Sequence, residues 1–381
     1  MYNEVVEFIK SLYPGIKPVP LHSPVFLGNE KEYLCDCIDS TFVSYVGKFV
    51  TQFEEITAKF TGAKYAVAVV NGTAALQIAL QIAGVKPDDE VITQPLTFVA
   101  TANAISHCGA KPVFVDVDLD TMGMSPKHLE DWLNENAVFD SKTGKTLNKT
   151  TKHLISAIVP MHTFGFPCRI EEIIEIANRY NIPVIEDSAE SLGSYYKGKH
   201  TGTFGLAGIL SYNGNKTITT GGGGMIITDN EDFARTSKHI TTTAKLPHKY
   251  EYVHDETAYN FRLTNINAAV GVAQMECITT YLENKRETAL KYQRYFDDKR
   301  ISFFTELEHT KANFWLNSLI LDNLEVRNEF LNYTIDNDVM TRPIWRLMNK
   351  LEMYKNCQTG NLANSFWLQD RVVNIPSGFR N

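Results

Sequence analysis

Short apolar runs alternate with helical segments along this chain, and this alternation constrains the fold more than any other feature. The first example is a buried strand over 65–70, a tight turn at Asn71-Gly72-Thr73 and a helix over 74–83. Strands that alternate with helices are typical of a largely parallel sheet with both faces covered. We therefore predict an α/β fold with a mainly parallel central sheet flanked by helices. Further strands are expected at 91–93, 112–115, 155–159, 184–185, 208–212 and 225–227, and a helix at 170–180.

The composition excludes several classes of protein. Hydrophobic residues make up 44% of the chain and charged residues 21%, which are ordinary globular values. No apolar run reaches the ~18 residues of a membrane-spanning helix, and no signal peptide pattern is present. The six cysteines include no C-x-x-C pair, which argues for a reducing cytoplasm and against zinc. A net charge of −7 without a basic block argues against nucleic acid. We expect a cytoplasmic protein with no metal, membrane or nucleic-acid partner.

Two domains are predicted from the length of the chain and from the change in its pattern of strand and helix signals after residue 265. A chain of 381 residues can form one large core and a second, smaller domain. Helical patterns cover 28–40 and 51–60, and a long helical stretch runs from Asn265 to about Lys299. The polar segment 140–152 is expected to be an exposed excursion. The predicted division is a large domain over 1–265, which includes an N-terminal segment 1–25, and a small C-terminal α+β domain over 266–381.

A polar loop with a single lysine follows one of the predicted strands. The strand over 208–212 leads into Asn213-Gly214-Asn215-Lys216, and four glycines follow at 221–224. A folded chain accepts such a glycine run where it turns tightly or approaches something closely. A lysine at the end of a buried strand is a candidate for Schiff-base chemistry. Taken alone, Lys216 is better explained as a solvated surface residue, so its role depends on other residues.

Asp187 supplies the second part of the pattern. It closes a buried strand over 182–186, at the carboxyl end where open α/β sheets bind their ligands. A buried carboxylate is costly unless a cation or several donors face it, and a protonated pyridine nitrogen is such a cation. Gly72-Thr73 opens a helix whose N-terminus suits a phosphate, and Phe98 offers an aromatic face. Each residue alone is more often structural, but together with Lys216 they form a complete site for pyridoxal 5′-phosphate.

These residues resemble the DegT/DnrJ/EryC1/StrS family of sugar aminotransferases. The matches run from Phe42-Val43 through Phe53-Glu54 to Pro376-Ser377-Gly378, and 159–165, 211–224 and 259–262 look most like the LegC-type members of the legionaminic acid pathway. The resemblance implies the fold-type I architecture of pyridoxal-phosphate-dependent transferases. The roles that it implies are Lys216 as the Schiff-base lysine, Asp187 on the pyridine nitrogen, Phe98 at the ring face, Gly72, Thr73 and Ser211 at the phosphate, and Asn260 at the phosphate of the neighbouring subunit.

One position departs from the family pattern. The family places His or Gln three residues after the aspartate, where this chain has Glu190. A carboxylate cannot donate to the phenolic oxygen of the cofactor unless it is protonated. Glu190 is therefore a cofactor-binding candidate, and a purely structural role is an equal alternative. His162 is a weak candidate for an acid–base group, since a lone histidine is more often structural. Weaker candidates for substrate contact are Lys245, His248 and Lys249, and the segment Thr341-Arg342-Pro343-Ile344-Trp345.

The resemblance also implies a reaction. We expect transfer of an amino group from glutamate, which becomes 2-oxoglutarate, to a nucleotide-linked 4-keto-6-deoxyhexose that carries a 2-acetamido group. Such a step belongs to cell-surface amino-sugar biosynthesis, and the implied active unit is a homodimer with shared active sites. The alternatives are a pyridoxal-phosphate-dependent sugar dehydratase, in which histidine replaces the lysine, and a non-catalytic regulatory protein with the same fold. A nicotinamide-dependent enzyme is disfavoured because no G-x-G-x-x-G follows a strand.

Overall fold

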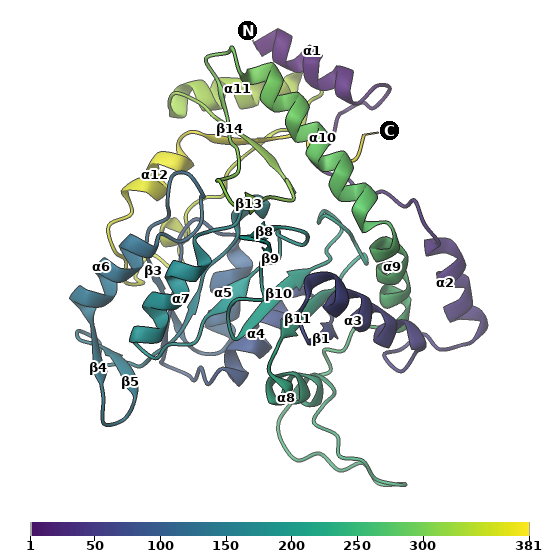
Figure 1. Cartoon of the computed structure of the whole chain (residues 1–381), viewed down its shortest axis with the longest axis vertical. Coiled ribbons are helices and arrows are strands. Elements are labelled where there is room, and N and C mark those ends of the chain that lie inside the picture. The colour runs from purple at the N-terminus through teal and green to yellow at the C-terminus, as the bar shows by residue number, and fades with distance from the viewer. Residues whose placement is uncertain (1, 381) are drawn as a thin grey trace.

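A computed structural model describes residues 2–380 and contains a central, mostly parallel sheet (Figure 1). The strands run in the order β3-β2-β6 and β7-β10-β11-β1, and parallel bridges at Ile158–Val184 and Met161–Asp187 join the two parts. Only β11 runs antiparallel to its neighbours in this sheet. The strands are β1 (Tyr65–Val69), β2 (Glu90–Thr93), β3 (Lys111–Phe114), β6 (Ile155–Val159), β7 (Ile185–Asp187), β10 (Ala207–Ser211) and β11 (Gly224–Thr228).

Helices cover both faces of the sheet because successive side chains of each strand point to opposite sides. In β1, Val67 and Val69 pack with α4 (Gly72–Ile82), whereas Ala68 packs with α3 (Lys48–Thr61). The predicted parallel sheet with two covered faces is therefore confirmed. The face of Val67 also carries α5 (Val99–His107) and α8 (Glu231–Thr241), and the opposite face carries α2 (Glu30–Asp39), α9 (Asn265–Glu276), α6 (Pro126–Asn136) and α7 (Ile170–Arg179).

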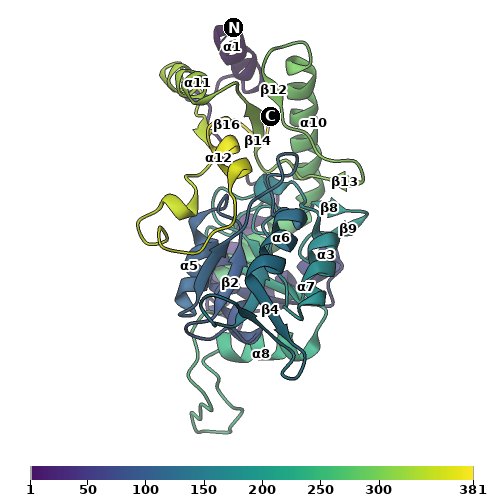
Figure 2. The same cartoon turned by 90° about the vertical axis from the view of Figure 1, so that its left-hand side faces the viewer.

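A second, antiparallel sheet in the C-terminal part has the strand order β12-β14-β16-β15. Helix α1 (Tyr2–Leu12) packs Val5 and Ile9 into the same core, beside Tyr292 of α10 and Phe330 of α11. Figure 2 shows these elements above the body of the molecule. The elements are α10 (Ile278–Phe296), β12 (Ser302–Phe303), β14 (Asn317–Ile320), α11 (Leu324–Asp336), β15 (Arg342–Pro343), α12 (Ala363–Gln369) and β16 (Val372–Ile375).

The domain boundary at residue 265 stays a proposal, and the packing of α1 bears on it. The sequence grouped the segment 1–25 with the large domain, but the apolar side of α1 contacts the C-terminal core. A helix with apolar residues at positions 5, 6 and 9 must bury that stripe, and the C-terminal sheet offers the matching surface.

Two local expectations are corrected by the structure. The helical stretch predicted from Asn265 to Lys299 is broken at Cys277, which ends α9 and precedes α10. The segment 140–152 forms part of a hairpin of β4 (Ala137–Asp140) and β5 (Lys145–Asn148), and Thr146 and Asn148 are buried. The remaining short elements are η1 (Thr163–Gly165), β8 (Tyr195–Tyr196), β9 (Lys199–His200), β13 (Thr310–Lys311) and η2 (Met348–Lys350).

The segment after α8 projects from the body of the molecule. Residues 242–260 extend away below α8 in both views and return to a bridge between Thr242 and Asn260 (Figures 1 and 2). Tyr250 and Tyr252 on this segment are 77% and 80% exposed. Within residues 2–380, none of the helices combines the length and the apolar character needed to cross a membrane.

Candidate active site

A cavity of about 350 Å³ lies at the carboxyl ends of β7 and β10. Ligands of open α/β sheets bind at this edge. The cavity brings together most of the residues that the sequence singled out, although they come from separate parts of the chain. These are Gly72, Thr73, Phe98, Asp187, Glu190, Ser211 and Lys216.

The start of α4 forms one end of the cavity. The side chain of Asn71 accepts a hydrogen bond from the N–H of Ala74 at 2.8 Å and so caps the helix. The first N–H groups of a helix have no partner within the helix, and they attract an anion. A Cβ on Gly72 would lie 3.0 Å from Cβ of Ser211, so the glycine keeps this turn close to the end of β10.

The glycine run allows the start of β11 to pack closely against the same turn. A Cβ on Gly224 would lie 2.4 Å from the carbonyl carbon of Asn71 and 2.7 Å from the nitrogen of Gly72. Real Cβ atoms do not come closer than 3.0 Å to such atoms. The close approach expected of the glycine run is therefore found at Gly224, where backbone packs directly on backbone.

Asp187 is buried at the end of β7, and hydrogen bonds fix its carboxylate. Thr101 donates to Oδ2 at 2.7 Å, and the N–H of Ala189 donates to Oδ1 at 3.2 Å. Because a carboxylate only accepts, Thr101 must use its single proton here, and its contact with Thr97 at 2.7 Å is then a bond that Thr97 donates. The sequence gave no signal for Thr101, which lies 86 residues before Asp187 on α5.

Lys216 projects from the loop after β10 and is 12% exposed. Its Nζ lies 4.2 Å from the centre of the Trp315 ring, within the range of a cation–π contact. The indole N–H of Trp315 donates to the carbonyl of Asn215 at 2.6 Å and so holds the loop from the C-terminal part of the chain. Trp315 was missed in the sequence, since its role depends on a contact 100 residues away.

Glu190 faces Lys216 inside the cavity. Its Oε1 lies 3.2 Å from Nζ of Lys216, and its Oε2 accepts a hydrogen bond from the N–H of Phe164 at 2.9 Å. Burial raises the pKa of the Glu190 carboxyl to about 7, although Lys216 and the Phe164 N–H oppose this shift. The carboxyl can therefore carry a proton near neutral pH, which removes the objection that Glu190 has nothing to donate.

Aromatic side chains line the opening of the cavity. Phe98 is 49% exposed, and its ring centre lies 6.3 Å from that of Trp345. The buried ring of Phe164 packs against Trp345, and their ring centres lie 4.6 Å apart. Trp345 belongs to the segment 341–345 that the sequence named as a weak candidate for substrate contact, and it lines the cavity.

Three other predicted residues or groups lie elsewhere. Asn260 is exposed and does not line the cavity of its own chain. Lys245, His248 and Lys249 lie on the protruding segment 242–260. His162 is fully buried, contacts Glu186 at 3.0 Å and accepts from the N–H of Cys168, so its surroundings are those of a structural histidine.

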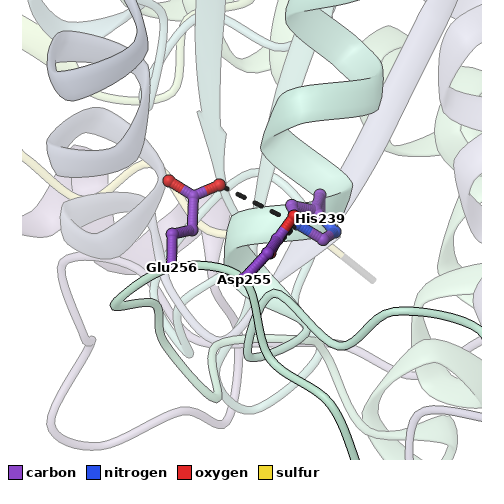
Figure 3. Close-up of side chains that lie close together, drawn as sticks. All are labelled: His239, Asp255 and Glu256. Atoms are coloured by element: carbon purple, nitrogen blue, oxygen red, sulfur yellow. Dashed lines mark hydrogen bonds and ion pairs between the residues drawn. The ribbon is translucent and has the colours of Figure 1, made fainter.

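One cluster within residues 2–380 has ligand atoms close enough to hold a metal ion (Figure 3). His239 in the last turn of α8 contacts Asp255 at 2.8 Å and Glu256 at 3.8 Å. The two carboxylates are exposed, and Nε2 of His239 is already hydrogen-bonded to Asp255. The cluster joins α8 to the returning part of the protruding segment, and none of its residues lines the cavity.

The donors in the cavity fit pyridoxal 5′-phosphate. The Asn71-Gly72-Thr73 turn leaves a cradle that a Cβ on Gly72 would reduce, and Ser211 lies beside it. A fixed carboxylate suits a protonated ring nitrogen, and a lysine suits an aldehyde. The exposed face of Phe98 offers a surface for a planar ring.

Comparison with known proteins agrees with this fit. The chain matches the DegT/DnrJ/EryC1/StrS aminotransferase family over residues 27–380. GDP-perosamine synthase of Escherichia coli O157:H7 is 37% identical over 364 residues, which cover 95% of this chain and 94% of the relative. GDP-perosamine synthase of Vibrio cholerae is 34% identical over 364 residues, which cover 94% of each. The structure of Helicobacter pylori PseC, an aminotransferase of pseudoaminic acid biosynthesis, has a TM-score of 0.84 at 23% identity and covers 94% of this chain and 93% of its own.

The chain belongs to the DegT/DnrJ/EryC1/StrS aminotransferase family. It is an aminotransferase with the fold-type I architecture, and its cofactor is pyridoxal 5′-phosphate. The family, fold and cofactor predicted from the sequence are thereby confirmed. The LegC-type subgroup stays a prediction.

Proposed function

We propose that this enzyme transfers an amino group from glutamate to a nucleotide-linked 4-keto-6-deoxyhexose in the synthesis of a cell-surface amino sugar. The observation that carries the proposal is the cavity in which Lys216, Asp187 and Glu190 meet the Asn71-Gly72-Thr73 turn. The relatives that are named GDP-perosamine synthases support a sugar linked to a nucleotide as acceptor. The 2-acetamido group rests on the LegC-type resemblance alone and is a separate part of the proposal.

The residues of the cavity have distinct roles in this reaction. Bound pyridoxal phosphate supplies an aldehyde that bonds to amines and a ring that withdraws electrons. Asp187, held by Thr101 and the Ala189 N–H, would accept a hydrogen bond from the ring nitrogen and favour its protonated form. Lys216 would hold the aldehyde through Nζ and, as a free amine, would serve as the base that moves a proton in the cavity.

The remaining groups would bind the phosphate of the cofactor and enclose the cavity. The hydroxyls of Thr73 and Ser211 and the N-terminus of α4 would hold the phosphate of the cofactor. Trp315 keeps the Lys216 loop in place, and Phe98 and Trp345 exclude water on the open side. The lysine at this position argues against a sugar dehydratase, in which histidine replaces it.

A homodimer with shared sites is the second part of the proposal. The exposed residues around α2 and the following loop include large apolar side chains. Exposed apolar side chains that lie together on a subunit usually mark an interface with another protein. Asn260 does not line the cavity of its own chain, and the segment 242–260 projects from the body of the molecule, as expected of a segment that contacts another subunit (Figure 2). The apolar side chains are Phe26, Ile38, Phe42 and Val46, which are 57%, 64%, 58% and 69% exposed.

The substrate is tested with enzyme that glutamate has converted to its amino form. This form is mixed with GDP-linked and UDP-linked 4-keto-6-deoxyhexoses, each with and without a 2-acetamido group, and with pyruvate and oxaloacetate. We expect the highest kcat/KM for a nucleotide-linked sugar. A higher kcat/KM for a free oxo acid contradicts the proposed acceptor, and a cofactor absorbance that glutamate fails to bleach in the first step supports a non-catalytic protein.

The shared site is tested by co-expressing Lys216→Ala and Asn260→Ala chains at limiting cofactor. If Lys216 of one chain and Asn260 of the other serve one site, each hybrid dimer has one intact site and one doubly defective site. With random pairing, about a quarter of all sites are then intact, by the two-fold symmetry of the interface. Hybrids with no activity place both residues in the site of one chain and end the shared-site proposal.

A further inference from the structure

Glu190 and Lys216 form a buried pair of opposite charge inside the cavity. Oε1 of Glu190 lies 3.2 Å from Nζ of Lys216, and the two side chains are 1% and 12% exposed. At this distance and burial, a proton can pass directly between the two groups without a solvent molecule between them. The pair therefore has two arrangements of equal total charge, an ammonium beside a carboxylate and an amine beside a carboxylic acid.

Two hydrogen bonds hold Glu190 in place whether or not it carries a proton. Phe164, whose φ of 55° lies in the left-handed region, donates its N–H to Oε2 at 2.9 Å. Asn313 donates its side-chain amide to the backbone carbonyl of Glu190 at 2.8 Å. Neither bond uses Oε1, which is left to face Lys216.

The surroundings of Glu190 favour its protonated form more than water does. Asp187 is the like charge that faces it, and Lys216 is the opposite charge. Burial is the largest influence and raises the pKa of the carboxyl to about 7. Loss of the ammonium removes the main charge that favours the carboxylate, so the carboxyl gains a proton when Lys216 becomes neutral.

We propose that Glu190 takes the proton that Lys216 must give up before its amine can act as a nucleophile or a base. The N–H bond at Nζ breaks, its electron pair stays on nitrogen, and an O–H bond forms at Oε1 of Glu190. No further reactant is needed, and the reverse step returns the proton. This inference rests on the proposed function of Lys216, but it concerns a proton transfer that can be measured without cofactor or substrate.

The first test replaces Lys216 by methionine, an uncharged side chain of similar length. We expect a protonated carboxyl in cofactor-free Lys216→Met at pH 7, seen by infrared spectroscopy as a carboxylic acid C=O band. The band disappears in the Lys216→Met, Glu190→Gln double variant. If the two spectra show no difference in this band at pH 7, Glu190 stays ionised without its partner and the proposal is wrong.

The second test follows the Lys216 amine itself. Cofactor-free protein is labelled with an acylating reagent across pH 6–9, and mass spectrometry gives the labelling rate of Lys216. Glu190→Gln keeps an oxygen for the Phe164 N–H but cannot pair with an ammonium. Because the variant loses the charged contact that stabilises the ammonium, we expect labelling at pH 7 to rise about 10-fold or more.

A matched control separates this role from a structural one. Glu171→Gln removes an exposed carboxylate that lies 2.5 Å from Lys197, and it should leave the Lys216 profile unchanged. If Glu190 only fills space and accepts from Phe164, Glu190→Gln also leaves the profile unchanged, which overturns the proposal. Both tests give an answer even if the sugar acceptor proposed above is wrong.

Discussion

Gly224→Ala should damage the cofactor site without touching any group that binds the cofactor. Gly224 is the first residue of β11, and it packs against the Asn71-Gly72-Thr73 turn at the start of α4. An added Cβ would lie 2.4 Å from the carbonyl carbon of Asn71, about 0.6 Å inside the closest distance that real Cβ atoms show. The neighbouring atoms are backbone, so no side-chain rotation can relieve the contact.

The magnitude follows from the two costs of moving this turn. Overpacking in a core costs ~1–3 kcal/mol of stability. Displacement of the turn by about half an ångström or more also weakens N–H bonds to the phosphate, and a bond to a charged group contributes ~1.5–3 kcal/mol. Loss of one such bond raises the Kd of pyridoxal phosphate roughly 10- to 150-fold, at ~1.4 kcal/mol per decade.

The assay is a titration of cofactor-free protein with pyridoxal phosphate, followed by absorbance, together with the Tm of the unliganded protein. The matched control is Gly214→Ala in the neighbouring loop, where an added Cβ meets nothing within 4 Å. We expect Gly214→Ala to bind the cofactor within about twofold of the natural protein, at the ~0.5 kcal/mol scale of a neutral surface change. Gly224→Ala that binds the cofactor as tightly as Gly214→Ala would refute the idea that β11 sets the position of the turn.

Three further outcomes are expected. Lys216→Ala should lose all transamination and the visible absorbance of the bound cofactor while keeping its circular dichroism spectrum; turnover without an added amine would contradict the role of this lysine. Asp187→Asn should still bind cofactor but turn over roughly 10- to 150-fold more slowly, since a charge-assisted hydrogen bond of ~1.5–3 kcal/mol is lost; kcat within threefold of the natural protein would show that Asp187 faces another group. Glu190→Gln should be more stable than the natural protein above pH 7 and not below pH 4.5, as checked by urea unfolding of cofactor-free protein. Burial raises the pKa of Glu190 from 4.5 to about 7, so its folded form loses stability as the pH rises through this window, by ~3 kcal/mol at most. An equal pH dependence for both proteins would mean that the Glu190 pKa is unchanged by folding.

The sequence predicted the parts of the site that depend on local pattern. Gly72 and Thr73 follow a strand, Asp187 and Ser211 end strands, and Lys216 lies in the loop beyond, so the alternation of strands and helices already brings them to one edge. Carboxyl ends of parallel strands meet at the same side of a sheet, which makes this kind of prediction possible. The same logic applies to the strands of the central sheet, which follow the predicted order, whereas the break at Cys277 and the hairpin of β4 and β5 were not predicted.

The remaining residues could not be predicted because they depend on tertiary contacts. Trp315 reaches the Lys216 loop from the segment just before β14, and Thr101 supports Asp187 from helix α5. No periodicity or spacing marks either residue. Glu190 was visible as a departure from a family pattern, but its contact with Phe164 depends on a left-handed residue that only the folded chain shows.

The packing of the two chain ends has a consequence for how the protein is made. The hydroxyl of Tyr13, just after α1, lies 3.3 Å and 3.2 Å from the carbonyls of Pro376 and Gly378. The last strand, β16, lies in the interior of its sheet, between β14 and β15. During synthesis this sheet cannot close until β16 has been made, so α1, which precedes it by most of the described residues, keeps its apolar stripe uncovered until then. An uncovered apolar helix on an incomplete chain is prone to aggregation, and the strands of the parallel sheet, which all precede β16, can pair during this interval.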